Sequence, residues 1–229
     1  MSSTNNNMGA ARAFGGLFIL TFFAYGVGTA MIEPIVKADD AMVQIQANRP
    51  TVIIAIILMA IVHTFANVGL ASIMSTIIKP YFGKLSTIYL GLAIASTVTL
   101  MIGAIFLALG MPLSELFAGV GEQDGSTHTL IGKLLVGVNF YSYQVGMTIW
   151  GIGGILLCFA LLRTRLVPVI FAIAGLLGYA VFIVGTIAEL YGIQIGVMLA
   201  IPGGFVEIAL SIWLIIKGFD YSTAGYKEA

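Results

Sequence analysis

The chain has 229 residues, of which 59% are hydrophobic and 9% are charged, and its formal net charge is zero. A typical soluble domain carries about 25% charged residues, so a soluble protein of this composition would lack the polar groups to cover its surface. The composition excludes an ordinary soluble domain and predicts a protein embedded in the lipid bilayer. Because no basic excess is present, nucleic acid is not expected as a partner.

The N-terminal residues 1–11 form a polar tail rich in Ser and Asn, with no charged side chain before Arg12. An apolar stretch from about Phe14 to Ile32 follows. This stretch is too long for the hydrophobic core of a secretory signal and long enough to cross a membrane. We therefore expect a retained first transmembrane helix over residues 12–33.

Five further stretches have the length and composition of a membrane span. A span needs about 20 mostly apolar residues, because the hydrocarbon core is about 30 Å thick and a helix rises about 1.5 Å per residue. The spans must be helices, since lipid leaves no partner for unpaired backbone groups and the period-two alternation of a membrane barrel is missing. The predicted spans are residues 12–33, 51–78, 86–110, 132–162, 167–189 and 195–217.

The predicted fold class is therefore all-α, a polytopic bundle of about six transmembrane helices. The helical domain covers residues 12–219, and a polar tail covers residues 220–229. The turns after the second and fourth spans are short and basic, whereas the connections after the first and third spans are longer and hold five of the ten acidic residues. Seven basic residues lie on the side of the short turns (Arg12, Lys79, Lys84, Arg163, Arg165, Lys217 and Lys227), and three lie on the other (Lys37, Arg49 and Lys133). This bias predicts that both termini are cytoplasmic.

The connection after the third span contains apolar residues at helical spacing. Leu113, Leu116, Phe117 and Val120 follow Pro112 in this pattern. They fit a short helix lying on the outer membrane interface, and they equally fit an apolar loop. Both interpretations stay open from the sequence.

Small residues are frequent in the last three spans. Small side chains let helices approach closely in lipid, where burial alone does not drive association. These glycines indicate close packing inside one bundle, with a contact between subunits of a homo- or hetero-oligomer as the alternative. They are Gly151, Gly153, Gly154, Gly175, Gly178, Gly203 and Gly204.

Glu207 is the most informative polar residue within the spans. It lies near the middle of residues 195–217, shortly after the helix-breaking sequence Pro202-Gly203-Gly204. A carboxylate at that depth must be protonated, paired or in contact with water. Either the helix is continuous and kinked, or it begins at Pro202 and holds Glu207 in its second turn, near the helix N-terminus. The functional hypothesis is a protonatable or cation-binding site, and the alternative is a structural carboxylate bonded to neighbouring helices.

His63 and Asn67 are four residues apart in the second span, so they share one helix face. Either residue is a candidate partner for Glu207 across the bundle. The alternative for His63 is a neutral ring bonded to a backbone carbonyl.

The fourth span begins with an unusually polar sequence. Asn139 and Tyr143 lie on one face, and Gln144 lies on another. These side chains are candidates for lining a vestibule open to the exterior, with interfacial anchoring of the tyrosines as the alternative.

The chemistry needed for most catalytic and cofactor sites is missing. Cys158 is the only cysteine, and His63 and His128 are the only histidines, so neither a thiolate metal cluster nor a bis-histidine haem is expected. Neither a G-x-S-x-G nucleophile elbow nor a glycine-lysine phosphate loop is present. We therefore expect no cofactor, no metal and no enzymatic activity, with an intramembrane enzyme as the alternative.

Two regions in the C-terminal half resemble a known family. Residues 162–168 read L-R-T-R-L-V-P and precede G-L-L-G at residues 175–178. In the final span, Pro202 is followed by Glu207 and by W-L-I-I-K-G-F at residues 213–219. This arrangement resembles a bacterial membrane family catalogued as domain of unknown function 4386, whose pattern has a proline, a glutamate five residues later and a W-L-I-x-K-G-F ending.

The resemblance covers most of the chain, although residues 139–144 and the outer loops match poorly. It implies a six-helix fold in the cytoplasmic membrane of a prokaryote. It also places Pro202 and Glu207 on one family motif, but it implies no particular activity.

Two functions compete at this stage. The first is a transport-type protein that moves a proton, a cation or a small solute and uses the Glu207 carboxylate. The second is a non-catalytic membrane subunit, sensor or lipid-binding module that acts through helix packing and the outer loops.

Overall fold

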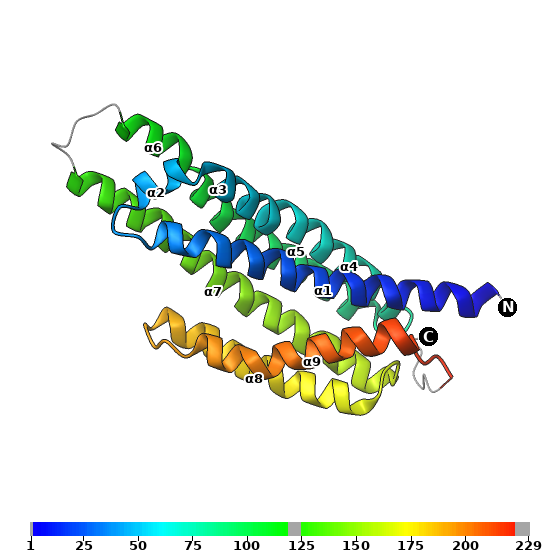
Figure 1. Ribbon diagram of the computed structural model, residues 1–229. Coiled ribbons are helices and arrows are strands. Elements are labelled where there is room, and N and C mark those ends of the chain that lie inside the picture. The colour runs from blue at the N-terminus through cyan, green and yellow to red at the C-terminus, as the bar shows by residue number, and fades with distance from the viewer. Residues whose placement is uncertain (1, 119–124, 223–229) are drawn as a thin grey trace. The chain divides into compact units, whose positions relative to one another are not determined.

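The computed structural model describes residues 2–118 and 125–222, and helices dominate both ranges (Figure 1). Six of the helical stretches are long and apolar enough to cross a membrane, as predicted. They are Met8–Val36, Arg49–Ile78, Gly83–Leu116, Thr129–Thr164, Val169–Leu190 and Gly196–Lys217. These helices confirm the all-α prediction. An apolar chain in lipid forms helices because every backbone N–H and C=O then finds its partner within the same segment.

The described elements follow one another with short connections. In chain order they are α1 (Ser2–Val36), α2 (Ala41–Ala47), α3 (Arg49–Ile56), the π-helix η1 (Ile57–Val62), α4 (His63–Ile78), α5 (Gly83–Ala108), α6 (Gly110–Ala118), α7 (Gly125–Thr164), α8 (Val169–Leu190) and α9 (Gly196–Lys217). The second span consists of α3, η1 and α4 without a break. A π-helical turn inside a long helix is rare and often lies near a functional site.

The segment after the predicted third span, residues 86–110, is helical, as one of the two interpretations predicted. It forms α6 and begins directly after Leu109. Val120 lies outside the described residues, and so does the side chain of Phe117. The position of α6 at the membrane interface stays a prediction.

The chain divides into two compact units, each with its own core. Unit 1 comprises residues 1–20, 65–97 and 144–229, and it contains all of α8 and α9. Its core is built on Phe14, Leu70, Tyr89, Leu161 and Leu214, all of them almost fully buried. At the end of α9, the Arg12 Nε of α1 donates a hydrogen bond to the Ile215 carbonyl over 3.2 Å. This bond satisfies one of the carbonyls that a helix C-terminus leaves unpaired.

Unit 2 comprises residues 21–64 and 98–143, and it contains all of α2, α3, η1 and α6. Its core includes Ile32, Val52 and Ala104. An ion pair between Arg49 and Glu115 joins the start of α3 to α6.

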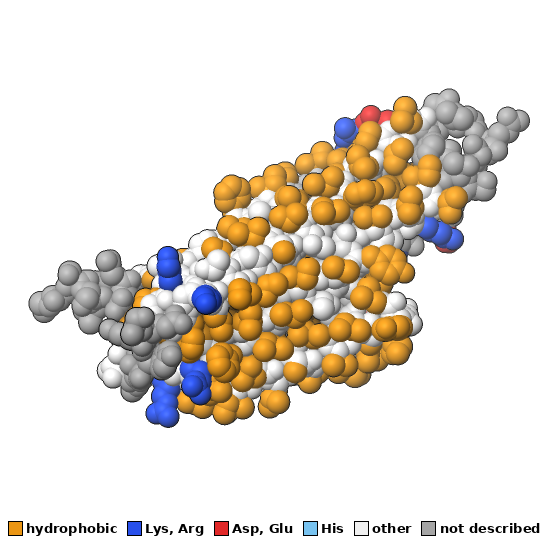
Figure 2. Space-filling model, turned by 180° about the vertical axis from the view of Figure 1, so that it is seen from behind, with side chains coloured by type: hydrophobic (Ala, Val, Ile, Leu, Met, Phe, Trp, Pro, Cys, Tyr) orange, Lys and Arg blue, Asp and Glu red, His pale blue; other side chains and the backbone are white. Residues whose placement is uncertain are grey.

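Apolar side chains cover much of the surface. Figure 2 shows them over most of the visible face, with few charged side chains among them. Phe65 of α4, Leu177 of α8 and Phe205 of α9 are all more than half exposed. Such a surface is stable in hydrocarbon and would aggregate in water, so the chain is a multi-pass membrane protein in contact with the bilayer.

Candidate functional site

Glu207 lies near the middle of α9, and the helix is continuous through Pro202. Of the two geometries that the sequence left open, the structure has the continuous helix, so Glu207 does not lie in the second turn of a helix that begins at Pro202. The proline lacks the backbone N–H of an ordinary helical residue. Glu207 is half-buried, and it is placed in the interior of a candidate membrane span.

The glycines around Pro202 bring two helix backbones together. A Cβ atom added to Gly178 of α8 would lie 2.9 Å from the Cα of Gly203 of α9. At a second point along this helix pair, a Cβ on Gly185 would lie 3.3 Å from the Cα of Gly196. These glycines pack inside the chain, as the first interpretation of the glycine pattern predicted. Gly204 is half-buried beside this contact.

Two neutral donors point at one oxygen of the Glu207 carboxylate. The Tyr179 hydroxyl of α8 donates a hydrogen bond to Oε1, and the Trp150 Nε1 of α7 donates to the same atom over 3.4 Å. Both rings are buried. The carboxylate is therefore held by side chains from two other helices, and each donor is uncharged.

Gly154 makes the position of Tyr179 possible. A Cβ atom at Gly154 would overlap three atoms of the Tyr179 ring. Because glycine has no side chain, the ring can cross the surface of α7 at this point and direct its hydroxyl at Glu207. The indole of Trp150 is held in turn by an edge-on contact with Phe18, at 6.0 Å between ring centroids.

Two more protonatable groups surround the carboxylate. The Tyr89 hydroxyl of α5 and the Cys158 thiol of α7 both interact electrostatically with Glu207. Tyr89 is 1% exposed, and its hydroxyl makes no hydrogen bond. A buried hydroxyl without a partner costs free energy, so this hydroxyl is available to hydrogen-bond a water molecule or a ligand.

Among the described side chains, neither ion pair involves Glu207: one joins Glu33 to Lys37 and the other joins Glu115 to Arg49. In the same part of the chain, no three His, Cys, Asp or Glu side chains come together as a metal site. The site thus consists of one carboxylate, two tyrosines, one tryptophan and one thiol. This set can exchange a proton or offer oxygen ligands to a cation.

Residues 13–218 match the family described as domain of unknown function (DUF4386). The chain belongs to this family. The match includes the Pro202 and Glu207 motif and every residue of the cluster around the carboxylate. No curated protein and no solved structure matches the chain.

Asn67 of this DUF4386 protein joins two neighbouring helices. Its Nδ2 donates to the Thr97 Oγ1 of α5 over 2.5 Å, and that hydroxyl donates to the Ala93 carbonyl over 2.7 Å. Neither hydrogen bond found for Glu207 goes to Asn67 or His63. The pairing of His63, which lies in the other unit, with the carboxylate stays a hypothesis.

His63 lies in unit 2, in the first turn after the π-helix η1. Its ring packs edge-on against Tyr25 of α1, at 5.2 Å between centroids. Its Nδ1 is buried and makes no hydrogen bond, so the bond to a backbone carbonyl that the alternative interpretation required is not found at this atom.

The polar start of the fourth span divides between the two units. In unit 2 of this DUF4386 protein, Tyr143 packs against Tyr25 at 5.7 Å between centroids, and the buried Asn139 Nδ2 lies against Gly103 without a hydrogen bond. Tyr25 thus brings His63 and Tyr143 together. Gln144 is buried in unit 1, where its carbonyl accepts a hydrogen bond from the Thr148 hydroxyl.

Four aromatic residues of these clusters were not singled out from the sequence: Tyr25, Tyr89, Trp150 and Tyr179. Each has an apolar ring that fits a lipid-embedded span and a polar atom that needs a partner when buried. An aromatic residue of this kind within a predicted span could therefore have been recognised from the sequence as a candidate for a buried hydrogen bond. The sequence does not indicate its partner, because the partner depends on which helices are neighbours.

Proposed function

We propose that this DUF4386 protein is a transport-type membrane protein that carries a proton or a cation by loading and unloading the Glu207 carboxylate. The observation that supports this function is the composition of the site. Glu207 lies inside a membrane span and is hydrogen-bonded by Tyr179 and Trp150, two neutral donors. Ionisable residues within membrane spans commonly mark ion and substrate pathways.

Neutral donors suit a carboxyl group that changes its charge. An ionised carboxylate accepts the bonds from Tyr179 and Trp150, and a protonated carboxyl group keeps Oε1 as an acceptor while it donates through its other oxygen. Both charge states are therefore compatible with the same arrangement of helices. A lysine or arginine partner would instead hold the group permanently ionised.

The hydroxyls extend this argument to cations. Glu207, Tyr179 and Tyr89 offer oxygen atoms from α9, α8 and α5, and hard cations such as Na⁺ bind oxygen ligands. The unbonded Tyr89 hydroxyl supplies a polar atom that a bound ion or its water molecule would satisfy. The proposal covers a proton, Na⁺ or a small solute that carries either of them.

Gradient dissipation in liposomes tests this function. Purified protein is reconstituted with a pH-sensitive or a Na⁺-sensitive dye inside the vesicles, and the corresponding imposed proton or Na⁺ gradient is followed over time. We expect the wild type to dissipate one gradient and Glu207→Gln to lose most of this flux. Glu189→Gln is the matched control, because Glu189 is another carboxylate, near the end of α8, and it accepts a hydrogen bond from the Gly196 N–H over 2.8 Å. A wild type that leaves both gradients intact contradicts the proposal.

We further propose that the protein lies in the cytoplasmic membrane of a prokaryote with both termini inside, and that it is not an enzyme. The alternative function is a non-catalytic subunit, sensor or lipid-binding module. The mixed-charge pocket described below favours its lipid-binding form. Purification with a stoichiometric protein partner, together with intact ion gradients, would favour the subunit form.

A further inference from the structure

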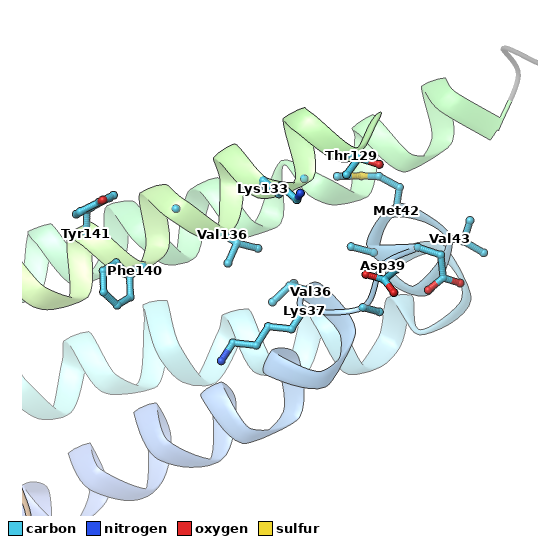
Figure 3. A pocket seen from close by; sticks show the side chains of 15 residues that line it. Val36, Lys37, Asp39, Met42, Val43, Thr129, Lys133, Val136, Phe140 and Tyr141 are labelled. Atoms are coloured by element: carbon cyan, nitrogen blue, oxygen red, sulfur yellow. The ribbon is translucent and has the colours of Figure 1, made fainter. Parts of the chain in front are cut away.

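Unit 2 contains an open pocket at one end of its helices, with a volume of about 810 Å³. The segment that joins α1 to α2 forms one side of the pocket, and the N-terminal part of α7 forms the other (Figure 3). This pocket shares no residue with the cluster around Glu207, so the inference drawn from it is independent of the proposed function.

The pocket lies where two spans end. Lys37 directly follows the first candidate span, Met8–Val36, and Lys133 lies four residues after the start of the fourth, Thr129–Thr164. The ends of apolar spans mark the depth at which the hydrocarbon core gives way to lipid headgroups. Side chains in this pocket are thus expected at headgroup depth.

Both signs of charge line the pocket. Lys37 and Asp39 come from the α1–α2 segment, together with Asp40, and Lys133 comes from α7. Lys37 pairs with Glu33 in an exposed contact between residues four apart, and Asp40 accepts a bond from the Gln44 amide. Neither Asp39 nor Lys133 has a hydrogen bond or an ion pair among the described contacts. The pocket therefore offers an uncompensated anion and an uncompensated cation.

Apolar side chains line the same pocket. Val136 of α7 points toward Val36, the last residue of α1, and Phe140 lines the pocket further along α7 (Figure 3). Val43 of α2, which also lines the pocket, is 62% exposed. The lining therefore changes from charged to apolar, and it continues into a surface suited to hydrocarbon.

We propose that this pocket binds the headgroup of a zwitterionic phospholipid with a primary ammonium group, of the phosphatidylethanolamine type. Lys133 binds the phosphate, and Asp39 accepts hydrogen bonds from the ammonium group. The acyl chains leave along the apolar wall at Val136 and Phe140. Charge-assisted bonds of this kind are stronger than neutral ones and give selectivity for the headgroup.

The chemistry of the headgroup distinguishes this lipid from its relatives. A choline headgroup carries the same charges but has no N–H to donate to Asp39, and a glycerol headgroup lacks the cation. A free glycerophosphoethanolamine carries the full headgroup without acyl chains. We assign the site to the lipid because an apolar wall adjoins the charged end.

Native mass spectrometry of delipidated protein in mild detergent tests the assignment. The protein is titrated with dioleoyl phosphatidylethanolamine, the matching phosphatidylcholine and phosphatidylglycerol, and glycerophosphoethanolamine. We expect one tightly bound ethanolamine lipid, preferred over the choline lipid about tenfold, the effect of one charge-assisted hydrogen bond.

Substitutions tie the preference to the pocket. Asp39→Asn should bind the ethanolamine and choline lipids alike, while Lys133→Gln should weaken all phospholipids about tenfold. Lys79→Gln is the matched control, because Lys79 is also an exposed lysine at the end of a span, outside unit 2. An unchanged preference in Asp39→Asn overturns the proposal. Equal binding of glycerophosphoethanolamine and the lipid overturns the lipid assignment.

Discussion

Glu207, Tyr179 and Gly154 depend on one another, since the glycine makes room for the ring whose hydroxyl reaches the carboxylate. Each of the three residues can be substituted while the other two side chains are kept. Substitutions at these positions therefore separate the chemistry of the carboxylate from the packing that positions it.

Tyr179→Phe removes the hydroxyl and keeps the ring. The ionised carboxylate then loses its principal donor, and hydrogen bonds to charged groups contribute roughly 1.5–3 kcal/mol. We expect ion flux in liposomes to fall about tenfold or more. The control is Tyr81→Phe, which changes a buried tyrosine at the α4–α5 turn. Equal flux in Tyr179→Phe and wild type would mean that Glu207 works without this bond.

Gly154→Ala places a methyl group inside the Tyr179 ring. Overpacking of a buried contact costs typically 1–3 kcal/mol, so we expect a lower midpoint of thermal unfolding in detergent. Gly91→Ala of α5 is the matched control, because a Cβ there meets no atom within 4 Å. Equal midpoints for the two variants would show that the ring moves aside without cost.

At the scale of the element, single hydrogen bonds and small residues join neighbouring helices in the part of the chain that the structure describes. Asn67 and Thr97 join α4 to α5 inside unit 1, while the glycines at 178 and 203 let α8 and α9 touch along their backbones. Both kinds of contact are suited to a bilayer, where moving an apolar side chain from lipid into the protein interior lowers the free energy very little. Small residues and single hydrogen bonds then determine which helices associate.

A double-mutant cycle tests the Asn67–Thr97 bond. Asn67→Ala and Thr97→Val each remove one partner, and interhelical hydrogen bonds in membrane proteins contribute about 0.6 to 1.7 kcal/mol. We expect the double variant to lose less stability than the sum of the single losses, measured by unfolding in mixed micelles. Strictly additive losses would show that the two side chains do not stabilise each other.

At the scale of the whole molecule, the distribution of basic residues predicts the orientation. Seven Lys and Arg residues lie on the side of the termini and three lie on the other, and basic residues stay in the cytoplasm. A C-terminal green fluorescent protein fusion should therefore fluoresce, because the fusion partner folds inside the cell.

The reciprocal measurement uses an alkaline phosphatase fusion after residue 222, which should stay inactive because this enzyme folds only outside the cytoplasm. A second fusion within the connection between α1 and α2 should be active and serves as the positive control. The reverse pattern would contradict the predicted topology.

The sequence alone determined the number of spans, their approximate bounds and Glu207 as the unusual residue. These features depend on the local apolar content of the sequence, because a stretch of about 20 mostly apolar residues is long enough to cross the hydrocarbon core. The sequence also left two choices open that the structure resolved. The helix α9 runs through Pro202 without a break. Residues 110–118 form a helix and not a loop.

Only the tertiary structure decided which residues meet. The sequence offered His63 and Asn67 as candidate partners of Glu207, and the hydrogen bonds that the structure shows for this carboxylate come from Tyr179 and Trp150. In a soluble protein an apolar stripe tells which helix face is buried. Lipid solvates apolar side chains on every face of a span, so the pattern of apolar residues does not show which face of a span is buried in the protein. The neighbours of each helix are therefore determined by packing between segments that are far apart in the chain.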